Sequence, residues 1–326
     1  MIGFSFFMAD NTQQGLQNQM YGVLVFLFVV ITLIFQVIPM FVTQRELYES
    51  RSDALATHSG EDVAWLTSHR ERKCRTYHWA AFVLSNVLAE IAWNTGVAVV
   101  CFLVWFYPMG LFRNAKWTGT VHIRSTLVFL NIWSAFLFGS TLAHALIAGL
   151  PTAEAASALG NVLGICVSGT TFLHVGGLLL TLSQMYEFAG VLVKPGDLPR
   201  FWIFMYRVNP FTYLTSSFLS AAIGEAPVQC AANELLVMEA PESQTCGEYL
   251  SAYISMAGGY VADPSATGVC QYCPINSTTA FLESNSISFV NRWRDFGFLW
   301  IYICFNIAAA CALYWLCRMP KRRTKA

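Results

Sequence analysis

The sequence predicts an all-α, polytopic membrane protein, and three observations support this fold class. First, 56% of the 326 residues are hydrophobic and only 12% are charged, which is more apolar than a soluble domain requires. Second, several uncharged runs reach the roughly 20 residues that one bilayer crossing needs. Third, the 19 basic residues equal the 19 acidic ones in number, but 11 of the basic residues gather in two segments. Membrane lipid is therefore the expected surrounding, and nothing indicates a nucleic-acid partner.

Apolar runs predict spanning helices at residues 22–41, 79–107, 127–150 and 296–317. Pro39 lies near the end of the first run, where a lost backbone hydrogen bond costs least. The apolar stretch 1–9 is too short to cross, so we expect it to be the end of a truncated helix. The next segment, "DNTQQGLQNQM", is polar without charge clusters and is predicted to be a short loop.

Basic residues predict the orientation of these helices. They gather between the first two crossings and after the last one, at Arg45, Arg51, Arg70, Arg72, Lys73 and Arg75 and at Arg318, Lys321, Arg322, Arg323 and Lys325. The positive-inside rule places both segments in the cytoplasm.

The polar loop at residues 224–294 is expected on the other side of the membrane. It contains the glycosylation sequence Asn276-Ser277-Thr278 and four cysteines, Cys230, Cys246, Cys270 and Cys273. The spacing of Cys270 and Cys273 also fits a zinc or redox pair, but disulfides are the favoured interpretation in an oxidising loop. Four cysteines allow three pairings, and the sequence does not choose among them.

A long apolar stretch, residues 154–193, is long enough for two crossings. We predict that it crosses once, because two crossings would place the cysteine loop and the basic tail on the wrong sides. The predicted fold then has about five complete crossings.

Motifs for catalysis are absent from the sequence. It contains no G-x-x-x-x-G-K-[ST] and no Gly-Lys pair, so no phosphate-binding loop for ATP is expected, and no metal site is predicted. Glu90 lies inside an apolar run and is a functional candidate on that ground. The favoured alternative is a structural hydrogen bond to Asn86 or Asn94, one helical turn away. The aromatic segment 198–214 is predicted to be an interfacial or re-entrant segment, with ligand binding as the alternative.

Several segments resemble the second, C-terminal membrane domain of fungal pleiotropic drug resistance ABC transporters. They are "GFSFFMADNTQQGLQNQM", "FVTQRELYE", "LSNVLAEIAW", "LPRFWIFMYRVNPFTYL" and "WRDFGFLWIYICFN", together with the four-cysteine loop. The resemblance implies an ABC-2 type permease domain, usually in the plasma membrane, that exports hydrophobic or amphipathic drugs or lipids. It also implies a second membrane half, and nucleotide-binding domains that supply ATP and Mg²⁺ from outside this sequence. The family hydrolyses ATP, but without an ATPase motif we do not expect this chain to be an enzyme by itself.

The resemblance places the substrate cavity along the helix that starts after Gln19 and the one that starts near Glu154. The candidate residues lie on the first of these. There Phe28, Thr32 and Phe35 share one helical face, and Gln36 adjoins it. Such a face suits apolar ligands with one or two polar groups, and ordinary helix packing is the alternative.

The resemblance also places a coupling surface for the ATPase domains at the cytoplasmic end of that helix. Its candidate residues carry both charges and are Arg45, Glu46, Glu49, Arg51, Glu71 and Arg72. Mixed charge suits an adjustable protein contact better than a lipid anchor, and a solvated loop is the alternative.

The sequence departs from the family in two short insertions, Ser52 to Arg70 and Leu163 to Leu178. We interpret both as translated introns, a hypothesis that sequencing the spliced message tests. With no ATPase and a truncated first helix, we expect the chain to be a fragment that transports nothing alone. A non-transporting remnant or accessory membrane protein is the second functional class, and an upstream in-frame ATPase domain would decide between the two.

Overall fold

A computed structural model describes residues 7–50, 79–150, 190, 195–201, 203–241 and 244–318, although the side chains of residues 27–36, 43–50, 79 and 318 lie outside the description. The predicted crossing 154–193 falls almost wholly outside the described residues, as do both insertions. The predicted truncated helix at residues 1–9 is described only from residue 7.

Long helices dominate the described chain. They are α2 (Gln13–Ser50), α4 (Trp79–Phe106), α6 (Val121–Ala148) and α13 (Arg292–Arg318). Among the described residues, three stretches are long and apolar enough to cross a membrane: Ala80–Phe106, Val121–Ala148 and Phe289–Cys317. They correspond to three of the predicted crossings and support a multi-pass, mostly helical membrane protein.

The start of α2 corrects one prediction. The polar segment before the first crossing is helical from Gln13 onward and is not a loop. Gln, Leu and Met are good helix formers, so the helix extends beyond its apolar part. The Thr12 hydroxyl accepts a hydrogen bond from the Gly15 N–H at 3.0 Å and satisfies one of the free donors of the first turn. An apolar run therefore predicts which part of a helix lies in the bilayer, but it does not predict where the helix begins or ends.

The chain divides into two compact units, and the division falls within α2, α4, α6 and α13. The first unit comprises residues 1–27, 99–132 and 186–297 and contains the cysteine loop. The second comprises residues 28–98, 133–185 and 298–326.

The core of the second unit consists of rings from its four long helices. Phe41 of α2 lies 4.9 Å from the His144 ring of α6 and 6.1 Å from Phe82 of α4. Phe82 in turn lies 6.1 Å from Tyr314 of α13. His144 bonds through Nδ1 to the Ser140 carbonyl at 2.8 Å, so it has a structural role in the core.

The core of the first unit surrounds α10 (Pro210–Ile223), which follows the short helix α9 (Ile203–Val208). Asn209 caps α10 by accepting a hydrogen bond from the Phe211 N–H at 3.0 Å, and Pro210 occupies the first helical position. Phe218 of α10 is fully buried and lies 5.3 Å from the Trp105 ring of α4. The segment predicted to be interfacial or re-entrant therefore contributes one small helix and the start of a buried one.

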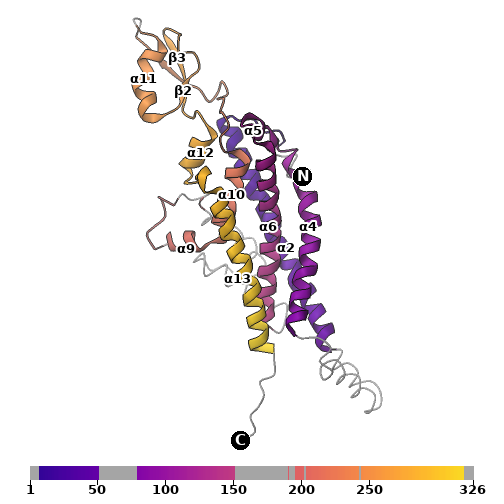
Figure 1. Ribbon diagram of the computed structural model, residues 1–326. Helices are drawn as coiled ribbons and strands as arrows, with labels where there is room; N and C mark the ends of the chain where they lie inside the picture. Colours follow the sequence, from indigo (N-terminus) through magenta and orange to yellow (C-terminus); the bar gives the residue numbers. More distant parts are fainter. Residues whose placement is uncertain are drawn as a thin grey trace, which may run out of the picture. The chain divides into compact units, whose positions relative to one another are not determined.

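The cysteine loop contains a small antiparallel sheet, which corrects the all-α prediction. Its strands β1 (Leu236–Glu239), β2 (Tyr260–Val261) and β3 (Val269–Cys273) lie in the order β1-β3-β2. In register, Leu236 pairs with Tyr272, and Tyr260 pairs with Cys273. Helix α11 (Cys246–Ala257) contacts β2 within the same unit (Figure 1).

The sheet forms around a core that hydropathy alone did not reveal. Cys246, Leu250, Val261, Cys270 and Tyr272 form one buried cluster. Gly259 has a φ of +82° and approaches the Cys273 carbonyl so closely that a Cβ would collide with it. After the sheet follow α12 (Thr278–Ser284) and the short helix η1 (Phe289–Asn291), which leads into α13.

Candidate functional site

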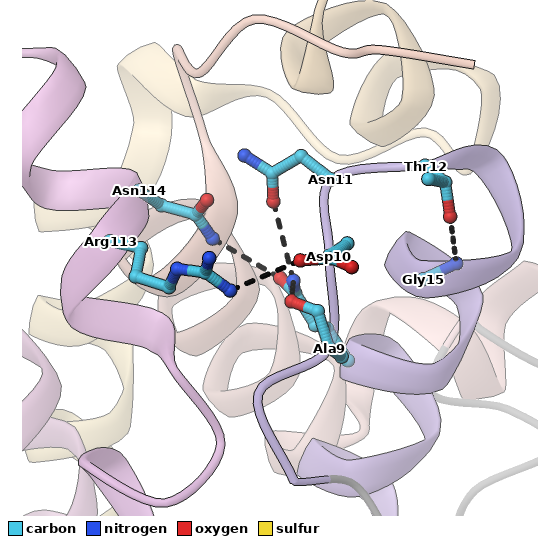
Figure 2. A network of polar contacts seen from close by, with 8 residues as sticks. Ala9, Asp10, Asn11, Thr12, Gly15, Arg113 and Asn114 are labelled. Carbon is cyan, nitrogen blue, oxygen red and sulfur yellow. Dashed lines mark hydrogen bonds and ion pairs between the residues drawn. The ribbon is translucent and has the colours of Figure 1, made fainter. Parts of the chain in front are cut away.

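A buried polar network in the first unit joins segments that are far apart in the sequence. Helix α5 (Leu111–Trp117) contributes Asn114, and α2 contributes Gln19; both side chains are 1% exposed. Asn114 Nδ2 donates to Gln19 Oε1 at 3.1 Å and to the Ala222 carbonyl of α10 at 3.4 Å. Gln19 Nε2 donates to the Ala9 carbonyl at 3.0 Å (Figure 2). One amide pair therefore holds α2, α5 and α10 together.

Arg124 extends this network from the start of α6, and it is 4% exposed. Its Nε donates to the Ala221 carbonyl at 3.0 Å, and its Nη1 donates to the Asn114 carbonyl at 3.3 Å and to Thr118 Oγ1 at 3.2 Å. No carboxylate in the described part of the chain forms an ion pair with this guanidinium. Its charge lies instead at the carboxyl-terminal turns of α10 and α5, where the helix dipoles are negative.

Asp295 holds the middle of α10 to α13. The Ser216 hydroxyl donates to Asp295 Oδ2 at 2.6 Å, and the Ser217 hydroxyl donates to the Arg292 carbonyl at 2.9 Å. Arg294 forms a two-pronged ion pair with Asp295 Oδ1 at 3.0 and 2.9 Å. Polar contacts thus fix the middle and the carboxyl-terminal turn of α10 in a largely apolar surrounding.

Glu234 of the cysteine loop fixes the start of α2. Its carboxylate accepts hydrogen bonds from the backbone N–H groups of Gln13 at 3.0 Å and Gln14 at 2.8 Å, and from Ala231 at 3.0 Å. Partial burial by itself raises the pKa of Glu234, but these hydrogen bonds outweigh it and hold the pKa below its ordinary value. A carboxylate at a helix amino terminus is also favoured by the helix dipole.

Disulfides select one of the three pairings that the sequence left open. Cys230 bonds to Cys273, and Cys246 bonds to Cys270. Cys270 and Cys273 therefore have different partners and do not act together as a zinc or redox pair. The Cys230–Cys273 bond ties the beginning of the loop to the end of β3, next to the point where Glu234 meets α2.

An open cavity of about 430 Å³ lies beside this junction. Three segments line it: residues 9–12 before α2, Arg113 and Trp117 of α5, and residues 227 and 229–231 at the start of the cysteine loop. Arg113 Nη1 forms an ion pair with Asp10 Oδ1 at 3.1 Å, and both side chains are well exposed (Figure 2).

The predicted cavity residues Phe28, Thr32, Phe35 and Gln36 all lie in α2, whose helical backbone is continuous through them. The helical spacing assumed for their common face therefore applies, but their side chains are outside the described residues. The same holds for Arg45, Glu46 and Glu49 in the last turns of α2, whereas Arg51, Glu71 and Arg72 are outside the described residues altogether. Both sets stay predictions.

The favoured interpretation of Glu90 is wrong. Its expected partners are the amides of Asn86 and Asn94, and neither Asn86 Nδ2 nor Asn94 Nδ2 has a hydrogen-bond partner in the structure. In α4 the three residues follow one another at four-residue intervals on one helical face. Adjacency on a helix surface thus does not establish a hydrogen bond.

Sequence reasoning missed Gln19, Asn114 and Arg124. The third crossing was expected to begin at residue 127, so Arg124 fell into a loop where a basic residue is unremarkable. Helix α6 in fact begins at Val121, which places Arg124 inside a candidate span. An arginine within the largely apolar run "VHIRSTLVF" is the signal that could have identified it.

Chemically, the described contacts position helices and do not form a catalytic centre. They consist of amides, a guanidinium, carboxylates and backbone groups that hold helix ends, without a nucleophile paired to a base. Such an arrangement suits a protein whose helices must keep a defined geometry in the membrane.

Comparison with known proteins shows what this chain is similar to. Residues 67–168 match the family described as ABC-2 type transporter. The chain is 55% identical, over 99% of its length, to ABC multidrug transporter F of Aspergillus fumigatus. It is 46% identical over 98% of its length to the ABC-type transporter oblD of Aspergillus clavatus. It is also 42% identical over 99% of its length to ABC multidrug transporter AFR2 of Cryptococcus neoformans. The chain spans 20%, 20% and 19%, respectively, of the length of these relatives.

Proposed function

The chain carries an ABC-2 type transporter membrane domain, and from this premise we propose that it is the transmembrane permease portion of an ATP-driven exporter. Its cargo is hydrophobic or amphipathic compounds, drugs or lipids. The observation that carries the proposal is the 55% identity to a multidrug transporter over 99% of this chain. The three candidate spans agree with a permease role because they supply the membrane part of such a transporter.

In this proposal, nucleotide-binding domains outside this chain supply the energy for export. The sequence contains no phosphate-binding loop, so ATP and Mg²⁺ are bound by nucleotide-binding domains encoded outside it. A second membrane half completes the pathway. The relatives are about five times longer than this chain, which leaves room for these parts in proteins of their kind.

Orientation in the plasma membrane follows from charge and cysteines. We place the basic segments in the cytoplasm, the disulfide-bonded loop outside, and a glycan on Asn276. The Asn276 side chain is exposed, as a glycan acceptor has to be.

Substrate contact and coupling are assigned to opposite parts of α2. Phe28, Thr32, Phe35 and Gln36 lie in its apolar middle, so they form the substrate face in this proposal. The charged residues from Arg45 to Arg51, with Glu71 and Arg72, receive the motion of the nucleotide-binding domains. A single continuous helix supports this assignment, because a rigid rod transmits a displacement at one end to the other.

A chimera tests the proposal. The corresponding segment of Aspergillus fumigatus ABC multidrug transporter F is replaced by this chain, and export of fluorescent drugs and ATP hydrolysis are measured in cells and in membranes. We expect export. A chimera that reaches the membrane and hydrolyses ATP but exports nothing would contradict the permease role.

Two variants of that chimera separate substrate contact from coupling. The double substitution Thr32→Ala and Phe35→Ala should change which drugs are exported at unchanged surface expression. Exchanging charges with Arg45→Glu and Glu46→Arg should leave ATP hydrolysis but abolish its stimulation by drugs. An unchanged drug spectrum counts against the substrate face, and normal drug-stimulated hydrolysis counts against the coupling surface.

A further inference from the structure

The cavity beside the start of α2 has features of a binding site that the transport function does not require. Its volume of about 430 Å³ lies within the range of pockets for small ligands. Among the residues that line it, Arg113 is the cation and Asp10 the anion, and Trp117 adds an aromatic ring that is 65% exposed. A ligand of this size would meet both charges and an aromatic surface.

The walls of this cavity are held by hydrogen bonds, whereas its two charged side chains are exposed. Asn114 lies next to Arg113 in the chain and is held in the buried network, which fixes the backbone of α5. The Gln229 N–H donates to the Asn11 carbonyl at 3.0 Å, and the Met8 N–H donates to the Pro108 carbonyl at 2.9 Å. Because the backbone of the walls is already held in place, binding a ligand costs less conformational entropy.

The ion pair at the cavity opens readily. The Arg113 side chain is 48% exposed and the Asp10 side chain 73% exposed, and exposed pairs of this kind contribute little stability. A ligand that carries both charges can therefore replace the ion pair at little cost, with one of its groups binding Arg113 and the other binding Asp10. A ligand with only one charge would pair with only one of the two side chains.

The position of the cavity indicates where such a ligand comes from. Arg113 and Trp117 lie in the short connection between the spans of α4, which ends at Phe106, and α6, which begins at Val121. Connections of this length between two spanning helices lie at the lipid–water boundary, where exposed tryptophan is favoured. Phospholipid headgroups are the abundant ligands at that depth.

We propose that this cavity binds the headgroup of a zwitterionic phospholipid, in which a phosphate is tethered to an ammonium group. The Arg113 guanidinium takes the phosphate oxygens, and the Asp10 carboxylate takes the ammonium. The Trp117 ring faces the same ammonium and attracts it through its π-system. This inference depends on the membrane spans but not on transport, so it holds or fails independently of the exporter proposal.

Direct binding to the purified chain tests it, with the chain held in a phospholipid-free detergent. The probe is dihexanoylphosphatidylcholine below its micelle concentration, and the dissociation constant is obtained from phosphorus NMR titration. Dihexanoylphosphatidylglycerol, inorganic phosphate and choline are measured in parallel. We expect the choline lipid to bind about tenfold more tightly than each of the three, because only it satisfies both charges. Equal binding of inorganic phosphate would show a simple anion site and overturn the proposal.

Variants locate the site. Arg113→Gln should weaken binding of the choline lipid about tenfold, and Asp10→Asn should abolish its advantage over the glycerol lipid. Lys116→Gln is the matched control, because Lys116 is on the same helix but lies over the Phe112 ring and outside the cavity lining. Trp117→Leu, at an exposed position, should weaken the choline lipid but not the glycerol lipid. Unchanged binding in both charge variants, or an equal loss in Lys116→Gln, would overturn the assignment.

Discussion

At the scale of single residues, the buried amide of Asn114 links three helices of the first unit, α2, α5 and α10. Substituting Asn114→Ala removes the donor to Gln19 Oε1 and to the Ala222 carbonyl and leaves both acceptors buried. We expect the free energy of unfolding to fall by about 1–3 kcal/mol, the cost of leaving buried polar groups unsatisfied. Denaturant unfolding of the purified chain in detergent measures this loss.

The control for that measurement is Lys116→Ala on the same helix. Lys116 is exposed, and its ammonium lies 5.1 Å from the centre of the Phe112 ring. Substitutions of exposed side chains change stability by about 0.5 kcal/mol or less. If Asn114→Ala proves as mild as this control, the buried amide pair does not stabilise the junction of α2, α5 and α10.

At the scale of elements, docking of the cysteine loop on α2 should depend on pH through Glu234. Its pKa is held below the ordinary value in the folded chain, so the ionised carboxylate contributes stability above that ordinary value. The contribution is lost as the pH falls through the lowered pKa. We therefore expect Glu234→Gln to lower the melting temperature at pH values above the ordinary carboxyl pKa, with a difference that shrinks as the pH falls through the lowered pKa.

Comparing melting curves of the wild type and the variant at several pH values measures this effect. The exposed Glu239 of β1 provides the control, because no hydrogen bond of its side chain anchors a helix in the described residues. Glu239→Gln should leave the melting temperature close to that of the wild type. A Glu234→Gln difference that is constant with pH would mean that the carboxylate does not fix the start of α2.

At the scale of the whole molecule, the orientation of the chain decides whether the loop can be glycosylated. We expect the protein made in eukaryotic cells to carry one glycan at Asn276, seen as a mobility shift that endoglycosidase removes. Asn276→Gln should abolish the shift, whereas Asn285→Gln should not, because Asn285 is not followed by an acceptor sequence. A loop that protease digests only after the plasma membrane is permeabilised would contradict the proposed orientation.

The sequence by itself determined those features that depend on composition along the chain. Apolar runs of bilayer length predicted the helices that the structure has as α4, α6 and α13, because the lipid interior requires every backbone group to bond within the helix. The resemblance of several segments to a known transporter family predicted an ABC-2 membrane domain, and the comparisons with known proteins confirm it. The helix ends were less accurate: α2 begins at Gln13, well before its apolar part, because polar helix formers extend it.

Only the tertiary structure decided which distant groups meet. Four cysteines permit three pairings, and the structure joins Cys230 to Cys273 and Cys246 to Cys270. Arg124 is separated in sequence from the Ala221 carbonyl by 97 residues, and no periodicity predicts that contact. The physical reason is that hydropathy and helix propensity are local along the chain. A disulfide or a buried hydrogen bond depends instead on how separate elements pack against one another.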